Sequence, residues 1–180
     1  SNEETTGRVT LFLLAEAGSC PGRQAYPPPE KIDPGLATPE TYLGAARAEG
    51  FLNGPLLPGR QDFRGGSEPV NVPPNGFFFR GEWLIDPESA ESIENAALDF
   101  RFKASKVFLV MGAEDGPANV RVLLDGKPIP DELAGEDVSG AVAEVSGQRL
   151  YRLADLPAAT DHVMTLEFDP GISGYAFTFG

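Results

Sequence analysis

The sequence of 180 residues has few of the side chains that most redox and metal centres require. It contains one cysteine, Cys20, and one histidine, His162. A single cysteine cannot form an internal disulfide or perform dithiol exchange, which needs a pair of thiols. A single histidine excludes a multi-histidine metal site. We therefore expect neither a cofactor nor a metal ion in this chain.

Basic residues and long apolar runs are also scarce. The chain has 14 Lys and Arg against 27 Asp and Glu, which gives a formal net charge of −13. So acidic a surface repels phosphate backbones and argues against a nucleic-acid partner. No run reaches the roughly twenty apolar residues needed to cross a bilayer, so we expect no direct membrane insertion of the chain.

What the sequence does contain is typical of a β-protein. Hydrophobic residues make up 41%, enough for a core, and there are 21 glycines and 17 prolines. Many turn residues between short apolar stretches favour strands joined by loops over helices.

The stretch from Ala96 to Gly126 carries the clearest strand signal. Apolar and polar residues alternate over 98–104, and an apolar run follows at 107–111. A third alternating segment, 119–124, ends at Asp125-Gly126, a dipeptide that favours a tight turn with positive φ. Three strands with no helix between them predict antiparallel pairing.

Similar signals recur along the chain, with loops predicted at 52–74 and 156–161. Eight to ten short strands without an internal repeat predict an antiparallel β-sandwich of the jelly-roll or carbohydrate-binding-module type. Besides the three strands above, the segments are 77–86, with a bulge at Gly81, and 141–145, 149–153, 162–168 and 175–179.

The first 37 residues differ from the rest. Residues 1–18 predict a short N-terminal helix from Glu3 to Gly18, although Arg8–Leu14 also alternates as a strand would. Residues 19–37 are rich in proline and are predicted to be a linker. The β-sandwich domain is expected to span 38–180.

Five motifs within 38–180, in this order, resemble a known family. The chain is similar to the C-terminal domain of DipZ-type proteins, which are DsbD-related thiol–disulfide transporters linked with cytochrome c biogenesis. The motifs are TPETYLG (Thr38–Gly44), GEW (Gly81–Trp83), VLLDGKPIP (Val122–Pro130), QRLYRL (Gln148–Leu153) and GYAFTFG (Gly174–Gly180).

The resemblance implies a β-sandwich that follows a thioredoxin-like domain, in an extracytoplasmic or periplasmic location. Residues 1–18 would then be the remnant of that preceding domain. The redox-active cysteines of the family belong to domains that this sequence does not contain, so no redox residue can be transferred to it.

Candidate binding residues were sought among aromatic and basic side chains, because sugars stack on exposed aromatic rings and their hydroxyl groups bind polar groups. These candidates are Tyr42, Arg80, Trp83, Arg101, Arg149 and Tyr151. The alternative for the aromatic residues is ordinary packing, and for Arg101 and Arg149 it is pairing with acidic residues across strands.

No convincing catalytic set emerges. Asp161 precedes His162, but adjacent strand residues point to opposite faces, so it is a poor orienter of the imidazole. The carboxylates Glu82, Asp99, Glu167 and Asp169 are expected to face solvent. The acidic loop with Asp131, Glu132, Glu136 and Asp137 lacks the spacing of a dedicated calcium loop.

We therefore expect a non-enzymatic accessory module of an extracytoplasmic thiol–disulfide protein that binds carbohydrate or cell-envelope glycan. The alternative is a structural module whose partner is the thioredoxin-like domain or another redox protein.

Overall fold

The computed structural model describes residues 38–64 and 71–180. In this part of the chain ten strands pair throughout in antiparallel fashion, and no helix is present. The predicted N-terminal helix, the linker and Cys20 lie outside the described residues. The strands are β1 (Thr41–Tyr42), β2 (Gly59–Asp62), β3 (Phe77–Ile85), β4 (Ala90–Ala113), β5 (Ala118–Leu124), β6 (Lys127–Pro128), β7 (Val138–Ser139), β8 (Val142–Val145), β9 (Arg149–Phe168) and β10 (Ile172–Phe179).

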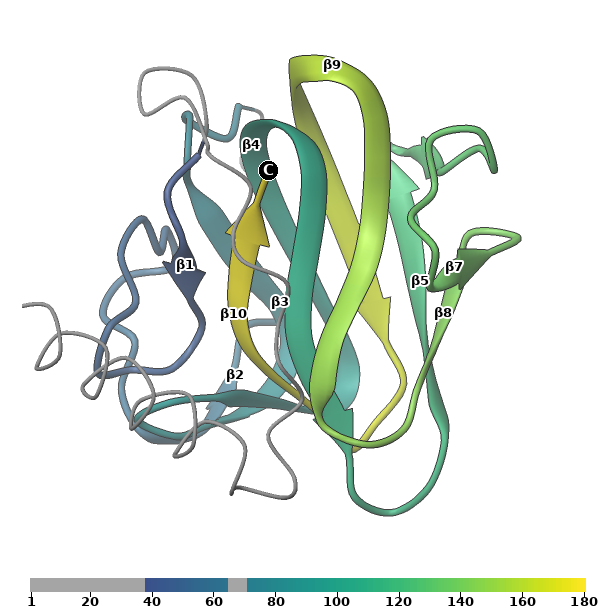
Figure 1. Cartoon of the computed structure of the whole chain (residues 1–180). Helices are drawn as coiled ribbons and strands as arrows, with labels where there is room; N and C mark the ends of the chain where they lie inside the picture. The colour runs from purple at the N-terminus through teal and green to yellow at the C-terminus, as the bar shows by residue number, and fades with distance from the viewer. Residues whose placement is uncertain (1–37, 65–70) are drawn as a thin grey trace, which may run out of the picture. The chain divides into compact units, whose positions relative to one another are not determined.

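The long strands β4 and β9 each run through both layers of a β-sandwich, and Figure 1 shows both bending over at the top of the view. The first half of β4 pairs with β3 and with the second half of β9, where Asp99 lies opposite Thr165. The second half of β4 pairs with β10 and with the first half of β9, where Leu109 lies opposite Tyr151.

One layer therefore has the order β2–β3–β4–β9–β5–β8–β7, and the other has the order β1–β10–β4–β9. The predicted antiparallel β-sandwich is confirmed. No helix in the described residues is long and apolar enough to span a membrane.

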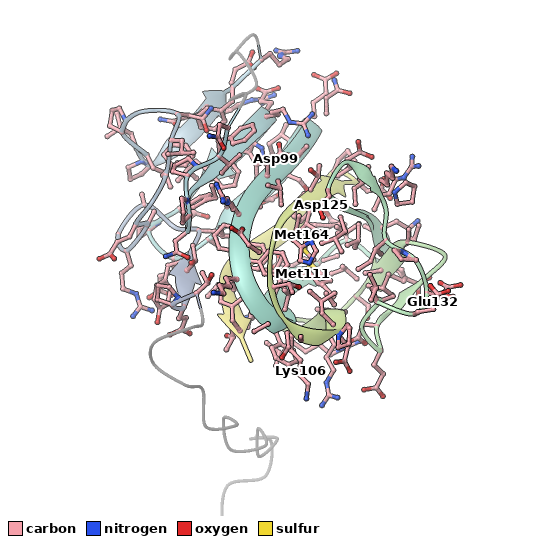
Figure 2. The ribbon with its side chains drawn as sticks, turned by 90° about the horizontal axis from the view of Figure 1, so that it is seen from above. Asp99, Lys106, Met111, Asp125, Glu132 and Met164 are labelled. Carbon is pink, nitrogen blue, oxygen red and sulfur yellow. The ribbon has the colours of Figure 1, made fainter. Side chains whose placement is uncertain are left out.

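The core lies between the layers and follows the period of two. In β4 the buried side chains Leu98, Phe100 and Phe102 alternate with Asp99 and Arg101 on the opposite face. Met164, Leu166 and Phe168 come from β9, as the alternation predicted, and Phe177 and Phe179 come from β10. In Figure 2 the labelled Met111 and Met164 lie inside the sandwich, and Glu132 lies on its outside.

The predicted boundaries were wrong where strands continue through a bend. Residues 98–104 and 107–111 form one strand, and 149–153 and 162–168 are likewise one strand. The predicted loop 156–161 is the bend of β9, where the pairing with β4 skips from Asp155 to Thr160. Proline and polar residues at this position resemble a loop in sequence, although the backbone on both sides stays paired.

Two further details differ from the alternation pattern. Strand β2 lies within the predicted loop 52–74, because backbone pairing with β3 forms it without any apolar side chain. In the predicted strand 175–179, a period of two would place Tyr175 on the same face as Phe177 and Phe179. The register of β10 shifts between Gly174 and Ala176, and Tyr175 is only half-buried.

The predicted irregularity at Gly81 is confirmed. Between Arg80 and Glu82 the partner strand advances by an extra residue, from Ala97 to Glu94. Gly81 has a φ of +78°, and a Cβ atom on it would lie 2.1 Å from the carbonyl oxygen of Asn95. The close approach of two backbones requires glycine here.

Gly81→Ala is expected to lower the free energy of unfolding by at least about 1–3 kcal/mol, the usual cost of such backbone strain, with the clash adding to it. Gly147→Ala is the matched control, because Gly147 has open space around its α-carbon and no positive φ. Urea denaturation measures both variants, and equal stability of the two would contradict this account.

Candidate functional site

An open hollow of about 620 Å³ lies on the outer face of the layer that contains β3, β4 and β9. We call it the sheet groove. It is formed by side chains that alternate with core residues along these strands, together with the turn after β5 and residues just before β3. The described lining residues are Asn71, Val72, Phe78, Arg80, Asp99, Arg101, Leu123, Asp125, Gly126, Asp161, His162, Val163, Thr165 and Glu167.

Arg80, Asp99 and Thr165 connect three neighbouring strands across the groove. The Nε atom of Arg80 donates to Oδ2 of Asp99 over 2.8 Å, and the hydroxyl of Thr165 donates to Oδ1. The side chain of Asp99 is only 11% exposed. A carboxylate this buried requires such partners, because an uncompensated charge there would be costly.

Arg101 and Asp161 form a second, bidentate pair between β4 and β9. Nε and Nη2 of Arg101 lie 3.0 and 2.7 Å from the two carboxylate oxygens of Asp161. Nη1 donates to the carbonyl of Val72 over 3.0 Å. The hydrogen bond from Arg101 lowers the pKa of Asp161, so the carboxylate stays charged and holds the guanidinium in place.

His162 bridges the turn after β5 and strand β9. Its Nδ1 atom lies 2.6 Å from Oδ2 of Asp125, and its Nε2 atom lies 2.7 Å from the hydroxyl of Thr160. Oδ1 of Asp125 also accepts from the backbone N–H of Val163. An aspartate beside Nδ1 favours the tautomer with the proton on that atom, and it fixes the ring orientation. The sequence had indicated that Asp161 is a poor orienter, and the structure supplies Asp125 from the turn after β5.

Two of the predicted binding residues lie in the groove, namely Arg80 and Arg101. Trp83 and Tyr151 have no exposed surface. The indole of Trp83 stacks on Phe79, with ring centroids 4.4 Å apart, and its N–H donates to the carbonyl of Arg80. Both aromatic side chains complete the core, so a ligand at the surface does not reach them.

Tyr42 and Arg149 are at the surface, outside the groove. The guanidinium of Arg47 covers the ring of Tyr42 at 3.7 Å, and the hydroxyl donates to Glu40. Arg149 covers the ring of Tyr151 at 3.8 Å and donates to Asp137 over 2.8 Å. These contacts give both side chains packing roles.

Most of the acidic candidates already have partners. Glu82 pairs with Arg60, and Oδ2 of Asp169 accepts from the backbone N–H of Asn119. In the acidic loop, Asp131 accepts from the backbone of Gly140. The part of the chain that the structure describes holds no group of three or more His, Cys, Asp or Glu side chains arranged for a metal ion.

Sequence reasoning missed the acidic half of the groove. Asp125, Asp161 and Thr165 were not among the predicted residues, and Asp99 was expected only to face solvent. One signal was available, because Asp99, Arg101 and Thr165 fall on the polar face of predicted strands in the period-of-two pattern, whereas Asp161 falls in the predicted loop 156–161. Which polar face meets which depends on the register between β4 and β9.

Asp137 allows a test of the structural role assigned to Arg149. Burial by itself would raise the pKa of Asp137, but hydrogen bonds from Arg149 and from the backbone N–H of Arg152 lower it overall. A carboxyl group whose pKa is lowered by folding stabilises the native state above its unfolded pKa, here 3.8, and loses that contribution as the pH falls through the native pKa.

Asp137→Asn is therefore expected to cost about 1 kcal/mol near neutral pH, with a cost that shrinks below pH 3.8. Chemical denaturation over an acid pH series measures this difference. Glu132→Gln on the same loop serves as the control and should leave stability unchanged at every pH. A cost for Asp137→Asn that is independent of pH would refute the assigned role.

Comparison with known proteins gives one family and several distant solved structures, of which two are representative. A family two carbohydrate esterase from Clostridium thermocellum, solved with cellohexaose, is 16% identical with a TM-score of 0.47, over 58% of this chain and 31% of the esterase. A family two carbohydrate esterase from Cellvibrio japonicus is 11% identical with a TM-score of 0.42, over 78% of this chain and 33% of the esterase.

These alignments cover about a third of each esterase, and both TM-scores are below the level usually taken to mark a shared fold. They carry no weight for function. No curated protein sequence matches the chain. The model of the family described as thioredoxin-like C-terminal domain matches residues 38–180, which is the whole β-sandwich with its groove, and the chain therefore belongs to that family.

Proposed function

We propose that this domain is a non-catalytic recognition module of a DipZ-type thiol–disulfide protein, located outside the cytoplasm, and that it binds carbohydrate in the sheet groove. Membership of the thioredoxin-like C-terminal family supports the link to a redox protein. With Cys20 as its one cysteine, this chain has no thiol pair, so dithiol exchange would belong to another domain of that protein.

The observation that carries the proposal is the pre-organised polar lining of the groove. Arg80 is held by Asp99, and Arg101 is held by Asp161, so donors and acceptors stand side by side on rigid strands. Neighbouring hydroxyl groups of a sugar match such pairs, because each hydroxyl both donates and accepts. Little ordering of side chains is then needed on binding.

Apolar side chains among these polar groups supply the other half of a sugar site. Val72, Phe78, Leu123 and Val163 belong to the lining. Val72 and Phe78 are mostly buried, so Leu123 and Val163, which are half-buried, present most of this apolar surface. A pyranose has hydroxyl groups at its rim and C–H groups on its faces, so a mixed lining suits it. A groove with few exposed aromatic rings favours binding through hydrogen bonds more than through stacking.

The test is a titration of the chain with soluble oligosaccharides and peptidoglycan fragments, followed by amide NMR shifts and by calorimetry. Saturable shifts are expected on β3, β4 and β9. Asp161→Ala removes an acceptor and releases Arg101, and it should weaken binding about tenfold, or about 1.4 kcal/mol. Trp83 emission should stay unchanged throughout, because its side chain is buried.

Arg152→Gln is the matched control, since Arg152 forms an exposed pair with Glu136 away from the groove. The affinity of the Arg152→Gln variant for the saccharide should equal that of the unchanged chain. If no saccharide produces a saturable shift at millimolar concentration, the glycan-binding role is wrong.

We propose, as the second candidate, a module that contacts the thioredoxin-like domain of the same protein. It is favoured by Leu52 and Leu57, which are 40% and 56% exposed in the segment before the edge strand β2. Large aliphatic side chains exposed near an edge strand suit a protein contact.

For this candidate, Leu57→Asp should abolish heat of binding to the separately prepared thioredoxin-like domain. Val142→Asp, at an exposed position on β8, should leave that heat unchanged. Absence of any association for the unchanged chain would eliminate the contact role.

A further inference from the structure

Thr160, His162 and Asp125 form one hydrogen-bonded chain beside the bend of β9. His162 is the one histidine of the sequence, and both nitrogens of its ring have a partner. Nδ1 lies 2.6 Å from Oδ2 of Asp125, and Nε2 lies 2.7 Å from Oγ1 of Thr160. Oδ1 of Asp125 also accepts from the backbone N–H of Val163, so the carboxylate is itself held in place. The Arg–Asp pairs that carry the proposed function do not include these residues.

The proton positions follow from the two partners of the ring. The carboxylate of Asp125 only accepts hydrogen bonds, so Nδ1 of the neutral imidazole carries the proton and Nε2 keeps its lone pair. The hydroxyl of Thr160 is then the donor to Nε2. The carbonyl oxygen of Ala158 is a second acceptor for the same hydroxyl at 3.3 Å, and the shorter contact with Nε2 is the stronger one.

A nucleophilic hydroxyl must be reached from solvent, and its base must keep its orientation. Thr160 is exposed. The side chain of His162 is 23% exposed, and the centroid of its ring lies 6.1 Å from that of Phe102. Phe102 belongs to the buried core, so the imidazole lies next to the core while the hydroxyl of Thr160 faces incoming reagents.

The other carboxylate near the ring is compensated by cations. Asp161 directly precedes His162, but its carboxylate is bound by Arg101, and Lys103 lies opposite it in the register of β4 and β9. The hydrogen bond from Arg101 and, to a smaller extent, the charge of Lys103 lower the pKa of Asp161. Asp125 is therefore the carboxylate that acts on the imidazole by direct contact.

A hydroxyl that donates to an imidazole, which donates in turn to a carboxylate, is the arrangement that makes serine and threonine nucleophilic. We infer that Thr160 is a site of covalent modification, whose hydroxyl accepts acyl groups from thioesters or aryl esters. His162 acts as the general base, and Asp125 positions it. The inference goes beyond the proposed recognition function and does not depend on glycan binding.

The acyl transfer balances without any further reactant. Oγ1 of Thr160 attacks the carbonyl carbon of the ester as its proton passes to Nε2 of His162. The tetrahedral intermediate then expels the thiolate or aryloxide, and that leaving group takes the proton from Nε2. One C–O bond forms and one C–S or C–O bond breaks, which gives an O-acylated Thr160 and a free thiol or phenol. The acyl group is transferred to the chain itself, so the step is a modification and not a turnover.

Acetylation by p-nitrophenyl acetate tests the inference. The full chain is incubated with the ester, and acetyl groups are located by mass spectrometry of its fragmented peptides. Ser139 on β7 is the internal reference, because it is exposed and both nitrogens of the single imidazole are bound to other partners. General-base assistance contributes about 10²–10⁴-fold, so Thr160 should be acetylated at least on the order of a hundredfold faster than Ser139.

Variants assign the roles within the network. Thr160→Val removes the hydroxyl with little change of shape and should abolish acetylation at this position, whereas Thr160→Ser should restore it. His162→Gln should lower the rate at Thr160 to that of Ser139. Asp125→Asn should lower it by about tenfold or more, because the ring loses its preferred tautomer. Nitrogen NMR of the imidazole reports this directly, with one tautomer expected in the unchanged chain and a mixture in the variant.

The contrary outcomes are equally specific. Equal rates at Thr160 and Ser139 would overturn the inference, as would acetylation confined to lysine side chains. Selective acetylation of Thr160 that persists in His162→Gln would overturn the assigned base. The glycan titration measures a different event, so the proposed function stands or falls separately.

Discussion

The two bent strands β4 and β9 carry the rest of the domain, because each one belongs to both layers of the sandwich. They pair with each other along nearly their whole length, from Ala97↔Glu167 to Met111↔Arg149. In the first half of each strand, the side chains on one face pack into the core from one layer. In the second half, the side chains on one face pack into the same core from the other layer. Displacing either strand would therefore disturb both layers together. The register shifts between β4 and its neighbours β3 and β9 are for this reason features that the fold requires.

The groove inherits its rigidity from the same pair of strands. Its ion pairs cross from β3 to β4 and from β4 to β9, so each bond that shapes the groove also holds neighbouring strands in register. Exposed ion pairs contribute little stability by themselves. The pair of Asp99 with Arg80 is an exception, because the Asp99 carboxylate is mostly buried and depends on Arg80 and Thr165 for its hydrogen bonds. The shape of the groove and the packing of the strands are thus maintained by the same contacts.

The sequence alone determined the class of fold and much of the core. Period-of-two alternation identified the inward faces around Phe100, Met164 and Phe177, and Gly81 indicated the bulge, because local side-chain chemistry decides which residues avoid water. The five ordered motifs also indicated the family.

Only the tertiary structure decided how the polar faces meet. Arg80 and Arg101 were predicted as ligand contacts, and strand pairing places an aspartate beside each of them. Asp99 is 19 positions from Arg80, and Asp161 is 60 positions from Arg101, so the sequence alone does not show that they are neighbours. Trp83 and Tyr151 have the same residue types as exposed sugar platforms, and strand register buried them instead. Burial and register arise from contacts between distant segments, and a single sequence without those contacts cannot distinguish an aromatic residue of the core from one at a surface.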